Sequence, residues 1–165
     1  MTAAVPPRTP SVRRRLAAFV YEGVLLFGVV MTAGFVWSLA TQQRHALLGR
    51  HGLQVLLFLV LGLYFTWFWS HGGQTVAMKA WRIRLVASGG RPVSPARAAV
   101  RYLLAWLWFV PQLLAIWVAD LRGAVAVTGV LTAGVLAFAA LAWLHPSRQF
   151  LHDVLCGTRL IDTRS

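Results

Sequence analysis

Acidic residues are scarce in this sequence: four aspartates and glutamates occur among 165 residues, beside sixteen lysines and arginines. Charged residues of both signs make up 12% of the chain, whereas typical soluble domains contain about a quarter. The shortage of charge argues against a soluble globular domain. The shortage of acids also limits any chemistry that uses two carboxylates, because it would require Glu22 and Asp153 to meet in space.

Cysteine pairs and catalytic motifs are also missing. The single cysteine, Cys156, excludes an intrachain disulfide and a cysteine-based zinc site. No serine stands in a Gly-x-Ser-x-Gly context, no His-Glu-x-x-His motif occurs, and Lys79 is misplaced for a phosphate-binding loop. His71, His145 and His152 match no zinc-protease spacing. We therefore expect no enzyme activity, no metal site and no cofactor.

Apolar residues, in contrast, are abundant and occur in long runs. They make up 58% of the chain, and four runs lie at about residues 16–40, 53–69, 102–119 and 124–144. Each run approaches the roughly 20 residues that cross about 30 Å of hydrocarbon. The pattern predicts an all-α membrane protein, a bundle of four transmembrane helices. Pro111 is expected to kink the third span, and residues 120–123 are expected to form a tight hairpin.

The first apolar run has a second interpretation. Three arginines at positions 13–15 precede it, and residues 38–40 offer a small-x-small cleavage match, as in a secretory signal. The run is about 25 residues long, longer than the usual core of a signal, and it contains Glu22. We therefore favour an uncleaved first span.

Basic residues are distributed unevenly between the loops. Four lysines and arginines precede the first span, six lie between the second and third, and three follow the fourth, whereas the other side carries Arg44, Arg50 and Arg122. The positive-inside rule then places both termini in the cytoplasm (N-in, C-in) of a multi-pass protein of the plasma or inner membrane. The net charge of +12 is expected to face anionic lipid headgroups, not nucleic acid.

Short polar segments flank the apolar runs. Residues 1–12 are rich in proline, serine and threonine and are predicted to be a disordered tail ahead of a transmembrane domain at 13–162. Apolar and basic residues alternate from Trp81 to Leu85, which indicates a short cytoplasmic strand before a turn at 88–92. Ser94 and Pro95 mark a helix start. Residues 149–155 predict a short amphipathic helix that ends at Gly157 before a second strand. The sequence leaves open whether the two strands pair.

Glu22 lies inside the first apolar run, seven positions after Arg15 and therefore two helical turns away on nearly the same face. A carboxylate in hydrocarbon costs on the order of 2.5–3.5 kcal/mol on insertion scales, so it persists only where it is paired, protonated or beside a polar cavity. Helical rise places Glu22 about 10 Å deeper than Arg15. The pair predicts either a site for a proton or cation or a structural ion pair.

Three segments of the sequence carry a family resemblance. They are Arg15–Glu22 in the first run, Gly73–Lys79 with Arg82–Val86 after the second run, and Gln149–Asp153 with Gly157-Thr158 near the C-terminus. In order and spacing they resemble the RDD family of small bacterial membrane proteins over roughly residues 13–162. That family is named for an arginine and an aspartate in the first span and an aspartate near the last. Glu22 stands where the family has its first aspartate, which keeps the charge but lengthens the side chain by one methylene.

The resemblance implies a charged cluster made of Arg15, Glu22 and Asp153. Cation/proton exchange has been proposed within the family, and a scaffold or assembly role is the alternative. In a transporter, Glu22 would exchange a proton or cation, Arg15 would modulate its charge, and Asp153 would form part of the cytoplasmic mouth. In a scaffold, the same three residues would form a structural lock.

Supporting residues are expected around this cluster. Arg14 or Arg15 is predicted to form a salt bridge with Asp153 that ties the C-terminal segment to the first span. His152 is expected to orient Asp153, and Gln74 is expected to bond exposed carbonyl groups at a helix end. Because one copy has few helices to enclose a pathway, transport would favour a homo-oligomer. The identity of the ion or solute is not encoded in any motif of the sequence.

Overall fold

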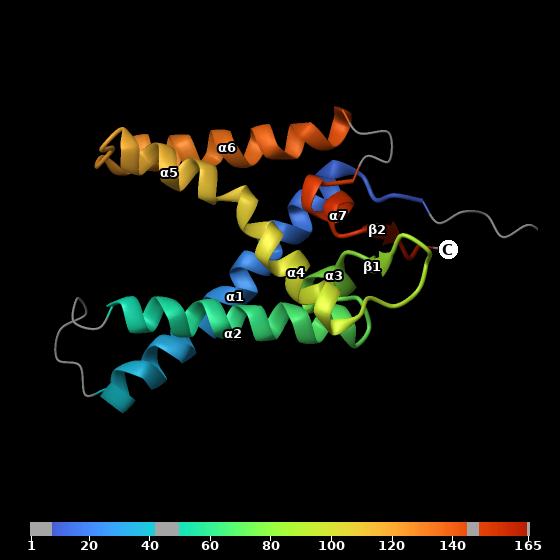
Figure 1. Ribbon diagram of the computed structural model, residues 1–165, viewed down its shortest axis with the longest axis horizontal. Helices are drawn as coiled ribbons and strands as arrows, with labels where there is room; N and C mark the ends of the chain where they lie inside the picture. The colour runs from blue at the N-terminus through green and yellow to red at the C-terminus, as the bar shows by residue number, and fades with distance from the viewer. Residues whose placement is uncertain (1–7, 42–49, 145–148, 165) are drawn as a thin grey trace, which may run out of the picture.

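The computed structural model describes residues 8–41, 50–144 and 149–164, and Figure 1 shows how their helices and strands are arranged. Four helical stretches are long and apolar enough to cross a membrane: Val12–Thr41, His51–Ser70, Pro95–Val118 and Ala124–Ala142. They confirm the four apolar helices that hydropathy predicts. The first and third stretches begin before the predicted runs, because the arginines that precede each run continue the helix.

The long helices pack in two groups. α1 (Val12–Thr41) packs on α2 (Arg50–Ser70), and α2 also packs along α4 (Pro95–Ala105). α5 (Val110–Val118) and α6 (Ala124–Leu144) form a helical hairpin. In Figure 1 this hairpin lies at the top of the view and α2 lies toward the bottom, while α4 connects the two regions.

The third span is broken into two helices. α4 ends at Ala105, a 3-10 turn η1 (Trp106–Trp108) follows, and α5 begins at Val110 with Pro111 in its first turn. Proline has no backbone N–H and fixes φ, so it fits the first turn of a helix and disrupts the interior. The predicted kink at Pro111 is therefore a break whose irregular residues lie just before the proline.

Gln112 occupies the space beside this break. With its amide oriented to donate, its side chain reaches the carbonyl oxygen of Trp108 at 3.0 Å and that of Phe109 at 3.1 Å. Both carbonyls belong to the stretch where the regular helix is interrupted. On the other side, a Cβ atom added at Gly134 of α6 would overlap the Gln112 side chain. A side chain at position 134 would therefore displace Gln112 from this position.

Gly134→Leu is expected to lower the melting temperature of the detergent-solubilised protein, because forced overpacking of this kind costs about 1–3 kcal/mol. Gly129→Leu is the matched control: it lies on the same helix, and a Cβ atom there meets no atom within 4 Å. Thermal unfolding followed by circular dichroism measures both. Equal melting temperatures for the two variants would show that Gln112 does not pack on α6 in this way.

The two predicted strands pair. β1 (Ile83–Ala87) and β2 (Thr158–Asp162) form an antiparallel ribbon in which Leu85 lies opposite Leu160. Ile83, Leu85 and Leu160 are buried, so the ribbon presents apolar side chains to the core. Leu85 N also donates to the carbonyl oxygen of Gly73 at 2.7 Å, which holds the turn after α2 against β1. The pairing that the sequence left open is therefore formed.

Two short helices, α3 (Val76–Ala80) and α7 (Leu151–Leu155), lie at the same end as the ribbon (Figure 1). The described part of the predicted tail also lies there, because Asp162 N donates to the carbonyl oxygen of Arg8 at 2.8 Å. Residues 1–7 of that tail lie outside the described residues. Segments from the start, middle and end of the chain thus meet at one end of the bundle.

Buried apolar side chains gather at this ribbon end. They include Trp69 of α2, Tyr102 of α4, Trp108 of η1 and Phe150 before α7. Away from this end, large apolar side chains on the long helices are exposed, as lipid-facing positions are in a membrane protein. The core therefore lies where the helices meet the ribbon.

Candidate functional site

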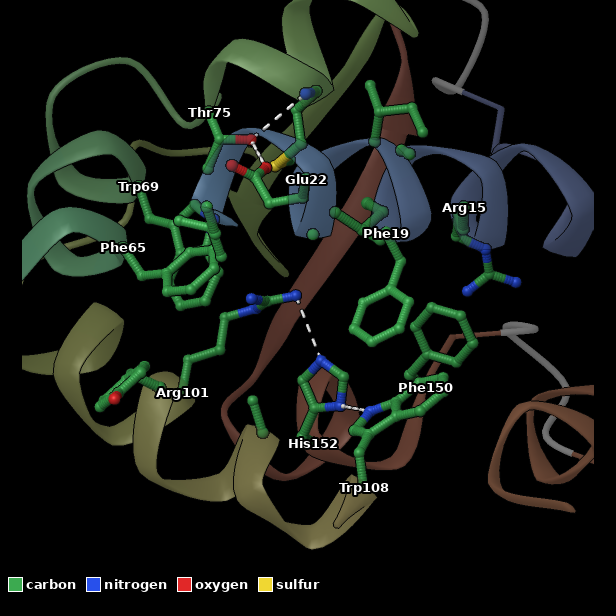
Figure 2. Close-up of a pocket in the computed structure, with 18 of the residues that line it drawn as sticks. Arg15, Phe19, Glu22, Phe65, Trp69, Thr75, Arg101, Trp108, Phe150 and His152 are labelled. Carbon is green, nitrogen blue, oxygen red and sulfur yellow. Dashed lines mark hydrogen bonds between the residues drawn. The ribbon is translucent and has the colours of Figure 1, made fainter. Parts of the chain in front are cut away.

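A cavity of about 450 Å³ lies within this core, between α1, α2, the α4–η1 segment and α7. Its volume falls within the range of about 300–1,000 Å³ that is usual for small-molecule sites. Most of its lining is apolar or aromatic. The charged and polar side chains that line it come from several elements, as Figure 2 shows: Arg15, Glu22, Thr75, Arg101 and His152.

Glu22 is buried on the inner face of α1, with 7% of its surface exposed. Tyr64 of α2 donates from its hydroxyl to Glu22 Oε1 at 2.7 Å, and Thr75 donates from its hydroxyl to Oε2. Both carboxylate oxygens therefore have hydroxyl partners from other elements. Glu22 faces the interior of the bundle, where a carboxylate in a membrane protein can be solvated.

The local sequence explains why the hydroxyl of Thr75 points its proton at Glu22. Thr75 is the N-cap of α3, and its Oγ1 accepts a hydrogen bond from Met78 N at 3.2 Å. Gly72 and Gly73, with φ of +152° and +71°, turn the chain from α2 into α3. Because Oγ1 accepts from the backbone, its proton is available to the carboxylate.

Asp153 of α7 is fully buried and forms an ion pair with Arg101 of α4. Arg101 Nε and Nη2 lie 2.8 and 2.7 Å from Asp153 Oδ1, and the Thr158 hydroxyl donates to the same oxygen at 3.3 Å. Burial is the largest single effect and raises the pKa of the Asp153 carboxyl, but the charge and hydrogen bond of Arg101, together with the neighbouring basic side chains, hold that pKa below its ordinary value. The Trp69 ring covers the guanidinium at 4.1 Å. Asp153 is thus kept ionised.

His152 is held as a neutral ring between Arg101 and Trp108. Trp108 Nε1, which can only donate, lies 3.0 Å from His152 Nδ1, so Nδ1 accepts and the ring proton belongs on Nε2. Nε2 lies 3.2 Å from Arg101 Nη2 and 3.7 Å from Asp153 Oδ1. Burial lowers the pKa of His152 to about 4, and the field of Asp153 offsets only part of that shift.

The two neighbouring arginines of α1 have different surroundings. Arg15 is 3% exposed, and its guanidinium carbon lies 4.2 Å from the centre of the Phe150 ring. Arg14 pairs with Asp162 of β2 and also donates to the carbonyl oxygen of Arg82 at 3.2 Å. The hydrogen bond from Arg14 holds the pKa of the Asp162 carboxyl below its ordinary value. Arg15 therefore belongs to the cavity wall and Arg14 to the ribbon.

Apart from Arg101 of α4, the charged and polar groups that line the cavity come from three segments: the start of α1, the turn before α3 and the helix α7. A family profile described as the RDD family matches residues 9–157, a range that contains all three. The chain belongs to the RDD family. No curated protein and no solved structure matches it.

The three charged residues of the predicted RDD cluster have different neighbours in the structure. Glu22 has hydroxyl partners, and Asp153 is paired with Arg101. Arg15 stacks on an aromatic ring. Arg15 and Glu22 line the cavity, while Asp153 lies behind its wall beside Arg101.

The predicted salt bridge between the first span and the C-terminal segment forms with other residues. Arg14 pairs with Asp162, and Asp153 pairs with Arg101 in place of Arg14 or Arg15. The packing of the two C-terminal elements explains why the partners differ from the predicted ones. The start of α1 lies beside β2, whereas α7, which carries Asp153, packs on α4.

Two supporting residues also differ from the prediction in their contacts. Gln74 Nε2 donates to the carbonyl oxygen of Ile83 at 2.7 Å, so it fixes β1 and not a helix end. His152 lies beside Asp153 as expected, but its hydrogen bond comes from Trp108 Nε1, and its Nε2 lies 3.2 Å from Arg101 Nη2. His145 lies outside the described residues.

Tyr64, Arg101 and Trp108 belong to the site although sequence reasoning did not select them. Arg101 had a signal: it stands between Val100 and Tyr102, where the helix that begins at the loop already continues into the third span. The criterion that selected Glu22, a charge within an apolar helix, applies equally to Arg101. Tyr64 and Trp108 carry no such signal, because aromatic residues are common throughout the spans.

Proposed function

We propose that this RDD-family protein moves a proton or a small cation across the membrane, and that Glu22 is the group that binds and releases it. Glu22 is the acidic side chain that lines the cavity, and hydroxyl groups bond both of its oxygens. This pairing with hydroxyl groups, which carry no fixed charge, is the observation that carries the proposal.

Hydroxyl partners suit a group that must change its protonation state. A hydroxyl donates to a carboxylate and can also accept from a carboxylic acid. Glu22 can therefore gain or lose a proton while Tyr64 and Thr75 stay within hydrogen-bonding reach. An arginine partner would oppose such exchange, because neutralising one member of a buried ion pair leaves the other charge uncompensated.

Asp153 has the opposite character. Its carboxylate is bound by the Arg101 guanidinium, it is fully buried, and its pKa lies below the ordinary value. We therefore assign Asp153, Arg101 and His152 to holding α7 against α4, and we assign exchange to Glu22.

The proposal includes a location. The excess of basic residues in the ribbon-end loops favours both termini in the cytoplasm of a multi-pass plasma-membrane protein. Exposed arginines of those loops would then meet anionic headgroups. A homo-oligomer is favoured, because one copy offers few helices to enclose a path, and neither enzyme activity nor a cofactor is part of the proposal.

Glu22→Gln is expected to reduce flux in proteoliposomes to the protein-free level, because an amide cannot exchange a proton. Wild-type vesicles with a trapped pH-sensitive dye should show proton movement when a Na⁺ or K⁺ gradient is imposed. Asp120→Asn is the control, because Asp120 is exposed and paired with Arg122 in the α5–α6 turn, far from the cavity lining. Wild-type flux in a Glu22→Gln protein that melts at the wild-type temperature would refute the proposal.

A membrane scaffold is the second candidate, and the buried Arg101–Asp153 pair favours it. In that case no imposed gradient elicits flux from wild-type vesicles. Glu22→Gln then lowers the amount of folded protein in the membrane, because a hydrogen-bonded contact between α1, α2 and α3 is weakened. The flux of the wild-type protein therefore separates the two candidates.

A further inference from the structure

We propose that the cavity holds one acyl chain of a membrane phospholipid, and that the apolar lining of the cavity, not the charge of the headgroup, selects this occupant. The proposal goes beyond proton or cation movement. It concerns binding alone and does not require flux.

The surface that the cavity offers to an occupant is almost entirely apolar, and Leu61 and Phe65 are among the side chains that form it. The charged side chains of the lining contribute little of this surface, because Arg15, Glu22 and Arg101 are 3%, 7% and 6% exposed. Hydroxyl groups bond the carboxylate of Glu22, and a carboxylate binds the guanidinium of Arg101. An occupant of the cavity therefore contacts mainly carbon atoms.

The cavity is open toward the surface that lipid covers. Phe19, Val20 and Gly23 of α1 line it and are exposed, Phe19 by 43% and Val20 by 64%. They belong to a helix that is long and apolar enough to cross a membrane. Trp69 and Trp108 also line the cavity, and each is only 5% exposed (Figure 2). The cavity therefore leads from the bilayer to rings that the surrounding lipid does not cover.

Hydrocarbon suits this space better than water does. A buried water molecule needs two to four polar partners, and apolar cavities stay dry. An empty cavity loses dispersion contacts, because its lining has no partner atoms on one side. Lipid tails are as apolar as leucine side chains, so a chain that moves from the bilayer into the cavity restores these contacts without removing any polar group from water.

The length of the cavity along α1 matches one leaflet of the membrane. Arg15 and Leu26 both line it and are eleven residues apart, which is about 16 Å by helical rise. The hydrocarbon core of a bilayer is about 30 Å thick, so each leaflet contributes about 15 Å. Arg15 lies in the first turn of α1, at the ribbon end. The bound chain would therefore run from the ribbon end toward the middle of the membrane.

The test is photochemical labelling of the full-length protein in vesicles of phosphatidylcholine, part of which carries a diazirine in one acyl chain. Mass spectrometry then assigns the labelled residues. Trp117 of α5 is 78% exposed and should be labelled by surrounding lipid in any case. Trp69 is 5% exposed and should be labelled by a chain inside the cavity. Labelling of Trp117 without labelling of Trp69 would overturn the proposal.

Two glycines of α1 locate the bound chain. A Cβ atom added at Gly23 or at Gly28 meets nothing within 4 Å, but only Gly23 lines the cavity. Gly23→Phe is expected to fill the chain-binding space and to abolish labelling of Trp69 while labelling of Trp117 persists, whereas Gly28→Phe keeps both. Wild-type labelling of Trp69 in Gly23→Phe, or its loss in both variants, would show that the chain does not lie in this cavity. Since no flux is measured, this proposal and the transport proposal fail independently.

Discussion

Arg101→Leu is expected to destabilise the protein by about 3–5 kcal/mol, because it leaves the fully buried carboxylate of Asp153 without its cation. The effect is large since neither partner of this pair is screened by solvent: their side chains are 7% and 0% exposed. Chemical or thermal unfolding of the detergent-solubilised protein measures the loss.

Two further variants show whether the uncompensated charge of Asp153 causes the loss of stability. Arg101→Leu combined with Asp153→Leu is expected to recover much of the stability, because replacing both members of a buried pair by apolar groups is often neutral. Arg97→Leu is the matched control, one turn earlier on α4 and exposed, and should change stability by about 0.5 kcal/mol or less. If Arg101→Leu behaved like Arg97→Leu, the ion pair would not support the fold.

Acidification from pH 7 to pH 4 is expected to remove about 3 kcal/mol of stability through His152 alone. Its pKa is about 4 in the folded protein and 6.5 ordinarily. Between those values the unfolded chain binds a proton that the folded protein does not, so stability falls as the pH falls through this window. Each pH unit of such a difference is worth about 1.4 kcal/mol. Above about pH 6.5 the contribution is fully present.

His152→Gln tests this assignment, because the amide oxygen can accept from Trp108 Nε1 but does not titrate. The variant should lose the slope of stability against pH between about 4 and 6.5, while His71→Gln, which changes an exposed histidine, should keep it. Asp153 acts in the same direction at lower pH, since its folded pKa lies below the ordinary carboxyl value. Parallel pH profiles for wild type and His152→Gln would contradict the prediction.

Local patterns in the sequence predicted the spans and the strands. Long apolar runs fix the number of membrane-length helices, because the bilayer thickness sets their length. Alternation around Ile83–Ala87 reveals a strand, because successive side chains of a strand point to opposite faces. The family resemblance, confirmed over residues 9–157, added the residues worth following. The signals for the spans and for the strands each lie within a short stretch of the chain.

The partners of the buried charges could not be predicted in the same way. Whether Asp153 meets Arg15 or Arg101 depends on how α7 packs on α4, which no local pattern encodes. Glu22 likewise takes its partners from two other elements, through Tyr64 and Thr75. Helix caps and glycine turns indicate local structure only. The contact between Glu22 and Thr75, which are 53 positions apart, is fixed only by the complete tertiary structure.

The ion pair between α4 and α7 has a consequence for biosynthesis. Arg101 precedes Asp153 by 52 residues, so at 5–20 residues per second a ribosome delivers the guanidinium about 3–10 s before its carboxylate. The third span therefore enters the translocation machinery carrying a cation whose counter-ion is not yet made. The nascent protein must be held in an environment that solvates this arginine until the C-terminal segment docks and completes the fold.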